Sequence, residues 1–555
     1  MSVATAKTHV VTQDSVGVWP IAQSAAVISF GMYAFALAVR LWATSLIHFP
    51  LNEGSAYYAT VAANLADGRG LVIDSIWSYA TPPLTLPRPA FELWQPLATF
   101  IFAAPMSLLG STFAAAQLGS ALVGALVAPL AWLVARDTAS RLKLPERRAW
   151  FVAVGAGALA AVAGPMLLSA AVPDSYVVFT VLAIAACAVM PGAAAGNRVA
   201  LVCMGVLLGL AYLTRMEAIW LGVAFVAFVA IEGAGWRTVV SRSGTVAIVG
   251  ALIASPWWLR NLSVFGSPFP GQVADNIFLT YNEQIYAYTD QPTFYGWAAQ
   301  GPATMLTNIA IGFWHNTVDV LVVPVTAIAV VGLLTVAVAI ARRASLPVTV
   351  KRGGLAALLV AGALTFVTTS VFFPVATLWG TFEHASGPLL VGLIVAAVVG
   401  GDAFVAWLVK RRSWERENGW MAPAALLVIT IPIALFQMTM ATRQATADER
   451  SIAALAASLP AALDAAGVDE HAPVITDRSV WLSDALARPM LALPAEPTAT
   501  VIELARRFGA ASVVVVEGRG NYPAALGADT RCFTGVDPAA TGGAQVFVIA
   551  GECLR

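Results

Sequence analysis

The sequence predicts a mainly α-helical, multi-pass membrane protein with a small α/β domain at its C-terminal end. Of its 555 residues, 59% are hydrophobic and only 11% are charged, whereas a typical soluble domain carries about 25% charged residues. The apolar residues gather in runs close to the roughly 20 residues that a helix needs to cross a bilayer. Beyond about residue 440, short apolar strands alternate with helical patterns instead. These three observations define the predicted fold class.

Eleven apolar runs have the length and composition of membrane-spanning helices. They are expected at about residues 24–47, 113–135, 149–171, 175–192, 199–214, 217–233, 243–259, 317–341, 354–378, 386–409 and 419–440. A twelfth run, at about 95–110, is short and is interrupted by Pro96 and Pro105. We interpret this run as an interfacial or re-entrant helix, because counting it as a span would place one basic loop on the opposite side from the others.

The distribution of Lys and Arg predicts the orientation of the chain. Basic segments connect the runs on one side, and they contain Arg136, Arg141, Lys143, Arg147, Arg148, Arg198, Arg237, Arg242, Arg342, Arg343, Lys351, Arg352, Lys410, Arg411, Arg412 and Arg416. Since short loops rich in Lys and Arg stay in the cytoplasm, we expect a cytoplasmic N-terminal tail (1–23) and a location in the cytoplasmic membrane. The membrane domain then covers 24–440. Its long loops 48–94 and 260–316 face outside, together with an extracytoplasmic domain at 441–555.

The C-terminal domain is expected to contain a small sheet with mostly parallel strands. Short apolar strands are predicted at 473–477, 489–494, 512–518 and 545–551, and a helix is predicted at 498–510. Alternation of such strands with helices is typical of parallel sheets. Cys532 and Cys553 both lie in this domain, and an extracytoplasmic location would permit a disulfide between them. Their spacing alone does not decide whether it forms.

The charged and amide residues that adjoin the spans on the external face are few. In chain order they are Asn52, Glu53, Asp174, Arg215, Glu217, Arg260, Glu383 and His384. A charge near the bilayer interior costs roughly 2.5–3.5 kcal/mol on insertion scales, so such residues usually mark function. Because all of them face one side, they are expected to converge at one mouth. Carboxylates beside cations suit a reaction between a hydroxyl group and a phosphate-linked lipid.

Each of these residues also has a purely structural interpretation. Glu53 is equally well explained as a solvated loop acid, and Asp174 as the N-cap of the helix that follows it. Arg215 is explained as well by a structural pair with Glu217 or by snorkelling to the interface. A lone His384 is more often structural than catalytic.

The first external loop contains a helical pattern directly after Glu53. Tyr58, Val61, Ala62 and Leu65 recur at helical spacing, which predicts an amphipathic helix at the membrane surface. With the run at 95–110 beside it, this helix is expected to help form a groove for an amphiphilic substrate.

Several function classes are excluded or not indicated. Basic patches with interleaved aromatic residues are absent, so nucleic acid is not an expected partner. Dinucleotide, P-loop and HExxH motifs are absent. No His, Cys and Asp spacing supports a metal site, so neither a cofactor nor a divalent metal is indicated.

The order of several short motifs resembles one family of membrane enzymes. The motifs are “NEGSAYYATVAANLADGRG” (52–70), “RPAFELWQPLATFIFAAPMSLLG” (88–110), “VPDSY” (172–176), “GLAYLTRMEAIWL” (209–221), “SPWWLRNLSVFGSPFP” (255–270) and “GTFEHASGPLL” (380–390). They resemble segments of the GT-C glycosyltransferases, particularly the family 39-like group of protein O-mannosyltransferases and lipid A aminoarabinose transferases. Each motif alone is weak, but their order and common sidedness make the set specific.

The resemblance implies a GT-C fold and transfer of a sugar from a polyprenyl-phosphate donor to a glycan, lipid or protein hydroxyl. It implies inversion at the sugar carbon and a first-loop carboxylate as base, which points to Glu53, with Asp174 as the second carboxylate. Arg215, Arg260 and His384 are then phosphate-side candidates. The remaining candidates for substrate contacts are Asn52, Tyr57, Glu217 and Glu383.

The chain departs from this group at Asn52, where the resemblance leads us to expect an aspartate before the glutamate. Either Glu53 or Asp174 takes over as the base, or the chain is inactive. Two other functions therefore stay open. One is a transporter or flippase for a polyprenol-linked sugar, although no internal repeat is visible. The other is a non-catalytic membrane scaffold with an external binding domain.

Overall fold

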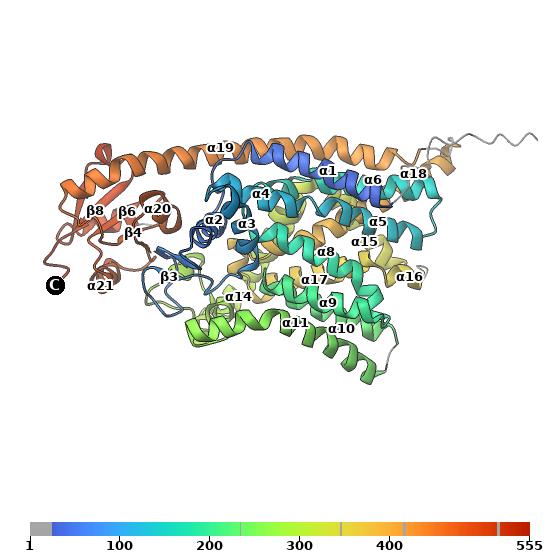
Figure 1. The fold of residues 1–555 in the computed structure, drawn as a ribbon, viewed down its shortest axis with the longest axis horizontal. Coiled ribbons are helices and arrows are strands. Elements are labelled where there is room, and N and C mark those ends of the chain that lie inside the picture. The colour runs from blue at the N-terminus through green and yellow to red at the C-terminus, as the bar shows by residue number, and fades with distance from the viewer. Residues whose placement is uncertain (1–24, 234, 344–346, 414–417, 519–521) are drawn as a thin grey trace, which may run out of the picture.

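The molecule is elongated, with a helical bundle at one end and a small α/β domain at the other (Figure 1). This computed structural model describes residues 25–233, 235–343, 347–413, 418–518 and 522–555. The predicted cytoplasmic tail (1–23) lies outside the described residues. One long helix, α19 (Met421–Ala465), runs along the bundle and continues to the α/β domain (Figure 1).

The bundle is built from helices that, apart from α14, coincide with the predicted apolar runs. They are α1 (Ala25–Thr44), α4 (Phe113–Gly124), α5 (Val127–Arg141), α6 (Glu146–Val162), α7 (Gly164–Ala170), α8 (Ser175–Ala194), α9 (Arg198–Tyr212), α10 (Ile219–Ile231), α11 (Trp236–Phe265), α14 (Gly301–His315), α15 (Thr326–Ala341), α17 (Gly354–Phe372), α18 (Gly387–Arg412) and the first part of α19. Among the described residues, eight helical segments are long and apolar enough to cross a membrane, or nine if α6 and α7, bent by 52°, form one span. The predicted spans at 199–214 and 217–233 are shorter helices, so eleven crossings remain a prediction.

Shorter helices and turns connect the longer elements. They are α2 (Glu53–Ala66), α3 (Leu97–Leu109), α12 (Gln272–Asp275), α13 (Phe294–Ala299), α16 (Val348–Lys351), the 3₁₀ turns η1 (Met216–Ala218), η2 (Asn276–Phe278), η3 (Asn282–Tyr286), η5 (Val323–Val325), η6 (Ala376–Trp379), η7 (Glu383–Ala385) and η8 (Pro538–Ala540), and the π-helical turn η4 (Asn316–Val322). The run predicted as interfacial is α3, a helix of 13 residues that packs against α2 and α4. The predicted amphipathic helix is α2. It is more enclosed than its pattern suggests, because α3 and the α/β domain both cover it.

Two helices extend further than hydropathy predicts. α11 continues to Phe265, so the second long loop begins after that residue, and α14 begins within the stretch predicted to be loop. Residue 441, where we expect the α/β domain to begin, lies inside α19. Beyond that point α19 is less apolar, but a buried stripe at Ile452, Leu455 and Leu459 continues with helical spacing and holds it against the α/β domain.

The α/β domain contains a six-stranded sheet with the strand order β2-β5-β4-β6-β8-β7. Its strands are β2 (Ser75–Ile76), β4 (Val474–Thr476), β5 (Met490–Ala492), β6 (Ser512–Val515), β7 (Phe533–Val536) and β8 (Gln545–Ile549), and its helices are α20 (Ser479–Leu486), α21 (Thr498–Phe508) and α22 (Tyr522–Ala528). β2, β5, β4 and β6 are parallel neighbours, while β8 pairs antiparallel with β6 and β7. Cys532 and Cys553 form a disulfide in this domain.

β2 was not predicted, and it belongs to the first long loop (48–94) rather than to the C-terminal part of the chain. Ser75 and Ile76 pair with Met490 and Leu491 of β5. Two residues carry too short a pattern to indicate a strand. Nearby, β1 (Val72–Ile73) and β3 (Arg88–Pro89) form a small antiparallel pair. The first loop is therefore part of the α/β domain's sheet, which fixes that domain over the mouth of the bundle.

Candidate active site

A cavity of about 460 Å³ lies between the bundle and the α/β domain. Four of the predicted residues with ionisable side chains line it, namely Glu53, Asp174, Arg215 and His384. Asn52 lines it as well. These residues come from α2, the N-terminus of α8, the break between α9 and α10, and the turn η7. The expected convergence of these external turns at one mouth is therefore present for these five residues.

Glu53 is the first residue of α2 and is contacted by Tyr286 from the second long loop. The Tyr286 hydroxyl donates a hydrogen bond to Glu53 Oε2 at 2.7 Å. The negative charge of Glu53 at a helix N-terminus is favoured by the helix dipole. α2 approaches Asp174 closely, because a Cβ added at Gly54 would lie 3.5 Å from Asp174 Oδ2. Two carboxylates thus share one end of the cavity.

Asn52 is the N-cap of α2. Its Oδ1 accepts a hydrogen bond from the Ser55 N–H at 2.7 Å, and its own N–H donates to Ser55 Oγ at 3.2 Å. This reciprocal pair provides acceptors for two backbone N–H groups that the helix end would otherwise leave unpaired. The Asn52 side chain is therefore used to start the helix that carries Glu53.

Asp174 is both a helix cap and a partner of His384. It is 3% exposed, and its Oδ1 accepts hydrogen bonds from the Tyr176 N–H at 2.8 Å and from His384 Nδ1 at 3.0 Å. Burial alone would raise the pKa of Asp174, but the charge and hydrogen bond of His384 and the Tyr176 N–H outweigh it and lower the pKa to about 2. Burial likewise opposes the charge on His384, yet Asp174 raises the pKa of that imidazole. The two groups form a partly buried pair, which is an ion pair when His384 is protonated.

Arg215 lies where the chain breaks between α9 and α10. Its Nη2 donates to Glu217 Oε1 at 2.8 Å and its Nη1 donates to Ser175 Oγ at 3.1 Å. The remaining guanidinium nitrogen, Nε, is buried and has no hydrogen-bond acceptor among the described residues. Since a buried charged donor without an acceptor is costly, this atom marks a place where an anionic oxygen would fit.

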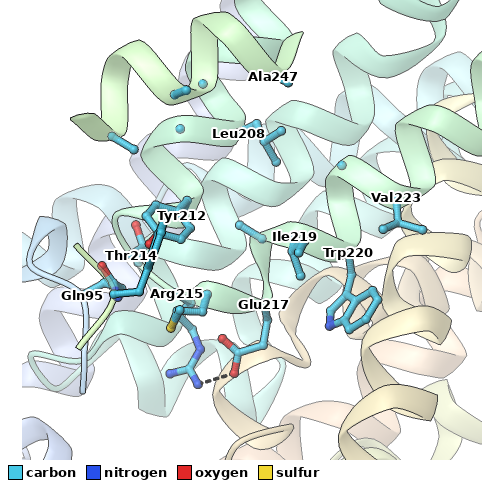
Figure 2. Close-up of a pocket in the computed structure, with 18 of the residues that line it drawn as sticks. Gln95, Leu208, Tyr212, Thr214, Arg215, Glu217, Ile219, Trp220, Val223 and Ala247 are labelled. Atoms are coloured by element: carbon cyan, nitrogen blue, oxygen red, sulfur yellow. Dashed lines mark hydrogen bonds and ion pairs between the residues drawn. The ribbon is translucent and has the colours of Figure 1, made fainter. Parts of the chain in front are cut away.

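A second cavity, of about 750 Å³, opens from Arg215 into the bundle. Its walls are largely apolar and come from α9, α10 and α11. Figure 2 shows the Arg215–Glu217 pair at one end of this groove, and Leu208, Ala247 and Val223 along its walls. Arg215 lines both cavities. A largely apolar groove and a polar cavity therefore share a wall that contains the Arg215 guanidinium group.

Three predicted residues line neither cavity. Tyr57 is fully buried, and its hydroxyl accepts a hydrogen bond from the Phe91 N–H at 2.7 Å. Arg260 stacks over Trp257 at 4.7 Å, because α11 continues past the point where a turn was expected. Glu383 is exposed beside His384, since neighbouring residues of a 3₁₀ turn point in different directions.

Five further residues of the polar cavity were not predicted. They are Gln444 and Asp448 of α19, Arg478 just after β4, Trp481 of α20 and Glu517 just after β6. A signal for two of them exists in the sequence, because ligands bind at the carboxyl ends of parallel strands. Asp448 carries no such signal, since it lies in the unexpected extension of α19. Among the described residues, no group of three or more His, Cys, Asp or Glu side chains gathers as a metal site would require.

Comparison with known proteins agrees with this architecture. Residues 88–259 match the family described as dolichyl-phosphate-mannose-protein mannosyltransferase. A search of curated proteins by sequence finds no match. Two solved structures have a similar fold. ArnT from Cupriavidus metallidurans bound to undecaprenyl phosphate is 16% identical, with a TM-score of 0.54 over 94% of this chain and 98% of that chain.

The second structure is the Archaeoglobus fulgidus oligosaccharyltransferase tethered to an acceptor peptide, 14% identical, with a TM-score of 0.55 over 95% of this chain and 74% of that chain. The chain therefore has the fold of the GT-C glycosyltransferases, as its sequence motifs indicate. The chain thus shares its fold with these two membrane proteins, and its match to the mannosyltransferase family is confined to residues 88–259.

Proposed function

We propose that this protein transfers a sugar from a polyprenyl-phosphate donor to an acceptor hydroxyl on the outer face of the cytoplasmic membrane. The observation that carries the proposal is the junction at Arg215, which lines both the apolar groove and the polar cavity and whose Nε has no acceptor among the described residues. The groove suits a polyprenyl chain, and Arg215 suits its phosphate, because guanidinium groups bind phosphate oxygens strongly. The similar fold of ArnT, a protein bound to undecaprenyl phosphate, supports this assignment.

Glu53 is the base in this proposal, rather than Asp174. A base must reach the acceptor hydroxyl and must be able to gain its proton at the operating pH. Asp174 is held by the His384 imidazolium and has a pKa lowered to about 2, so it is a weak proton acceptor. Glu53 accepts a hydrogen bond from the neutral Tyr286 hydroxyl and faces the same cavity.

The proposed step balances with the groups at the junction. Glu53 takes the proton of the acceptor hydroxyl while the acceptor oxygen attacks the anomeric carbon of the sugar. The bond from that carbon to the phosphate oxygen breaks, and the lipid phosphate leaves toward Arg215, whose charge stabilises it. Attack opposite the leaving group inverts the anomeric configuration.

The orientation with the site outside rests on two observations. The α/β domain carries the Cys532–Cys553 disulfide, and disulfides persist in oxidising compartments. The basic segments lie at the opposite end of the bundle, where the Arg141 guanidinium donates to the Thr349 carbonyl between α5 and α16 (Figure 1).

The test uses the full chain in lipid nanodiscs with radiolabelled polyprenyl-phosphate sugars and glycan, peptide or lipid acceptors. We expect transfer with an inverted anomeric configuration, and we expect Glu53→Gln to reduce it roughly 10²–10⁴-fold. Glu503→Gln, at an exposed carboxylate of α21, is the matched control. If Glu53→Gln transferred the sugar as fast as the wild type, Glu53 would not be the base. Donor binding that is unchanged in Arg215→Gln would remove the phosphate assignment.

A further inference from the structure

We propose that the α/β domain and the end of α19 form the acceptor-binding wall of the polar cavity, and that this wall selects an uncharged saccharide. The inference rests on the proposed function and names its acceptor class. The wall is defined here by five residues that share the cavity with Glu53 and Asp174, namely Gln444, Asp448, Arg478, Trp481 and Glu517.

The wall is positioned by the parallel part of the sheet. β4 and β6 are neighbours in parallel register, with Thr476 opposite Val514. Arg478 and Glu517 follow the carboxyl ends of these two strands, which is where open α/β sheets bind ligands. The domain therefore presents its ligand-binding edge to the cavity that holds the proposed base.

The wall is also held rigidly. Asp477 accepts hydrogen bonds from the backbone N–H groups of Val516, Glu517 and Gly518 at 2.9, 3.0 and 3.2 Å. Arg478 forms an ion pair with Glu517, and its guanidinium stacks over the Trp481 ring at 4.2 Å. Side chains that are fixed before binding lose little entropy when a ligand arrives.

The charge of the wall disfavours an anionic acceptor. Among the described residues, the wall contributes two carboxylates, Asp448 and Glu517, against one guanidinium, Arg478. Arg478 is already engaged by Glu517. Asp448 accepts hydrogen bonds from Gln444 Nε2 at 3.0 Å on both oxygens. A phosphate on the acceptor would meet a net negative surface here, and like charges across an interface oppose binding.

The remaining chemistry suits sugar hydroxyls and rings. Carboxylates, an amide and a guanidinium offer both hydrogen-bond acceptors and donors. The aromatic side chains of Trp77, Trp94, Tyr286, Trp379 and Trp481 also line the cavity. Flat apolar faces combined with a few oriented polar groups are the composition of a small-molecule site, and the volume of about 460 Å³ falls in the range of such sites.

The experiment measures acceptor binding and donor binding separately on the full chain in nanodiscs. The acceptor probes are uncharged manno-, galacto- and arabino-oligosaccharides, their phosphorylated counterparts and a Ser/Thr-rich peptide. Calorimetry measures the binding of each probe. We expect an uncharged saccharide to bind tightest. We expect Glu517→Gln and Asp448→Asn each to weaken it at least about tenfold, the effect of losing hydrogen bonds to a charged group. Glu503→Gln, with its exposed side chain outside the cavity, should bind as the wild type does.

Each outcome has a defined meaning. Tighter binding of a phosphorylated or peptide probe, or no binding of any uncharged saccharide, overturns the inference. Unchanged saccharide affinity in both Glu517→Gln and Asp448→Asn overturns it as well, provided that both variants bind the polyprenyl-phosphate donor normally. That donor measurement also separates the two proposals. If the wild type fails to bind the donor, the proposed function fails. If the wild type binds the donor and transfers the sugar, but the wall variants keep the wild-type acceptor KM, only this inference fails.

Discussion

At the scale of single residues, Asn52 explains how this chain differs from the acidic pair expected of its relatives. Asn52 begins α2 by capping it, and the reciprocal contact with Ser55 uses both its side chain and its backbone N–H. Asn and Asp cap helices about equally well. The position therefore meets a structural need with either residue, and the carboxylate that faces the cavity beside it is Glu53.

Substitutions at Asn52 should separate capping from catalysis. Asn52→Ala removes the cap and should lower the free energy of unfolding by about 1 kcal/mol, measured by urea unfolding in detergent. Asn52→Asp keeps the cap, so we expect wild-type stability. Because it only adds a negative charge beside Glu53 and close to Asp174, we expect no gain in transfer. A large gain in transfer by Asn52→Asp would mean that an acid at this position, and not Glu53, is the natural base.

The Asp174–His384 pair should make stability depend on pH in a defined direction. Asp174 has a pKa lowered to about 2 from an ordinary 3.8, so its contribution is present above 3.8 and is lost as pH falls toward 2. His384 has a raised pKa, so its contribution is present below the ordinary 6.5 and is lost as pH rises through the raised value. The pair is therefore strongest between about pH 4 and 6.5.

Thermal unfolding in detergent between pH 5 and 9 checks this expectation. The wild type should lose stability as pH rises above about 6.5, whereas His384→Gln should be less stable at pH 5 and should show a flatter profile. His471→Gln, at a His with 88% exposure, is the control and should follow the wild type. A His384→Gln profile parallel to that of the wild type would show that His384 is not charged in the pair.

The position of a residue in the sequence predicts only in part whether its side chain lines the site. Glu53, Asp174, Arg215 and His384 meet at one cavity because each lies at a helix end or in a turn on the same side of the bundle. That sidedness follows from charge and hydropathy. Glu383 precedes His384 directly, yet it is exposed and lines neither cavity. The direction of a side chain in a turn depends on local backbone angles, which the pattern of apolar and charged residues does not specify.

At the scale of elements, the break between α9 and α10 creates the groove. α9 packs closely on α11 through glycines, since a Cβ at Gly209 would lie 2.8 Å from the Gly250 carbonyl oxygen. The chain then turns at Thr214 and Arg215 before η1 and α10. α10 is thereby displaced, and small residues such as Ala247 line the space that is left. Hydropathy detects both helices, but it does not show that their junction carries a cavity.

Filling the groove should block the lipid chain without disturbing the polar cavity. Ala247→Trp places a large ring on the groove wall. The control is Ile248→Trp at the next residue of α11, where the side chain is 64% exposed and lines neither cavity. We expect Ala247→Trp to raise the KM for the polyprenyl-phosphate donor at least tenfold, which corresponds to about 1.4 kcal/mol, and Ile248→Trp to leave it unchanged. Equal donor KM values for the two variants would place the polyprenyl chain elsewhere.

The elements that sequence analysis missed are those that join the two parts of the molecule. Residues 441–465 continue α19, although their composition resembles that of a soluble domain. β2 is two residues long and pairs with a strand more than 400 positions away. Hydropathy measures a local property, so it finds spans well. Pairing between distant segments depends on the tertiary arrangement, and short strands carry little local signal.

At the scale of the whole molecule, the α/β domain is connected to the site in three ways. α19 is continuous with it, β2 joins its sheet, and Glu496 binds the second long loop. Glu496 is 7% exposed, and its carboxylate accepts hydrogen bonds from the backbone N–H groups of Tyr288, Thr289 and Asp290 at 2.5, 2.9 and 2.9 Å. This is the same loop that carries Tyr286 to Glu53. The domain thus holds a residue that contacts the proposed base.

Removing this clamp should slow the chemical step rather than weaken donor binding. Glu496→Ala frees the loop, so Tyr286 no longer fixes Glu53, and a displacement of about 1 Å can cost on the order of 100-fold in rate. We therefore expect a lower kcat with the donor KM kept, and Glu503→Ala, at an exposed position on α21, should match the wild type. Tyr286→Phe should lower kcat similarly, because it removes the hydroxyl that donates to Glu53.

The double variant Glu496→Ala/Tyr286→Phe decides whether the two residues act along one route. If Glu496 acts through Tyr286, the double variant should be no slower than Tyr286→Phe alone, because residues that act as a unit have non-additive effects. Losses that multiply would mean that Glu496 affects the reaction by another path, such as the position of the acceptor wall. Thermal unfolding of all three variants shows whether the α/β domain stays folded, so a simple loss of structure is distinguished from a loss of alignment.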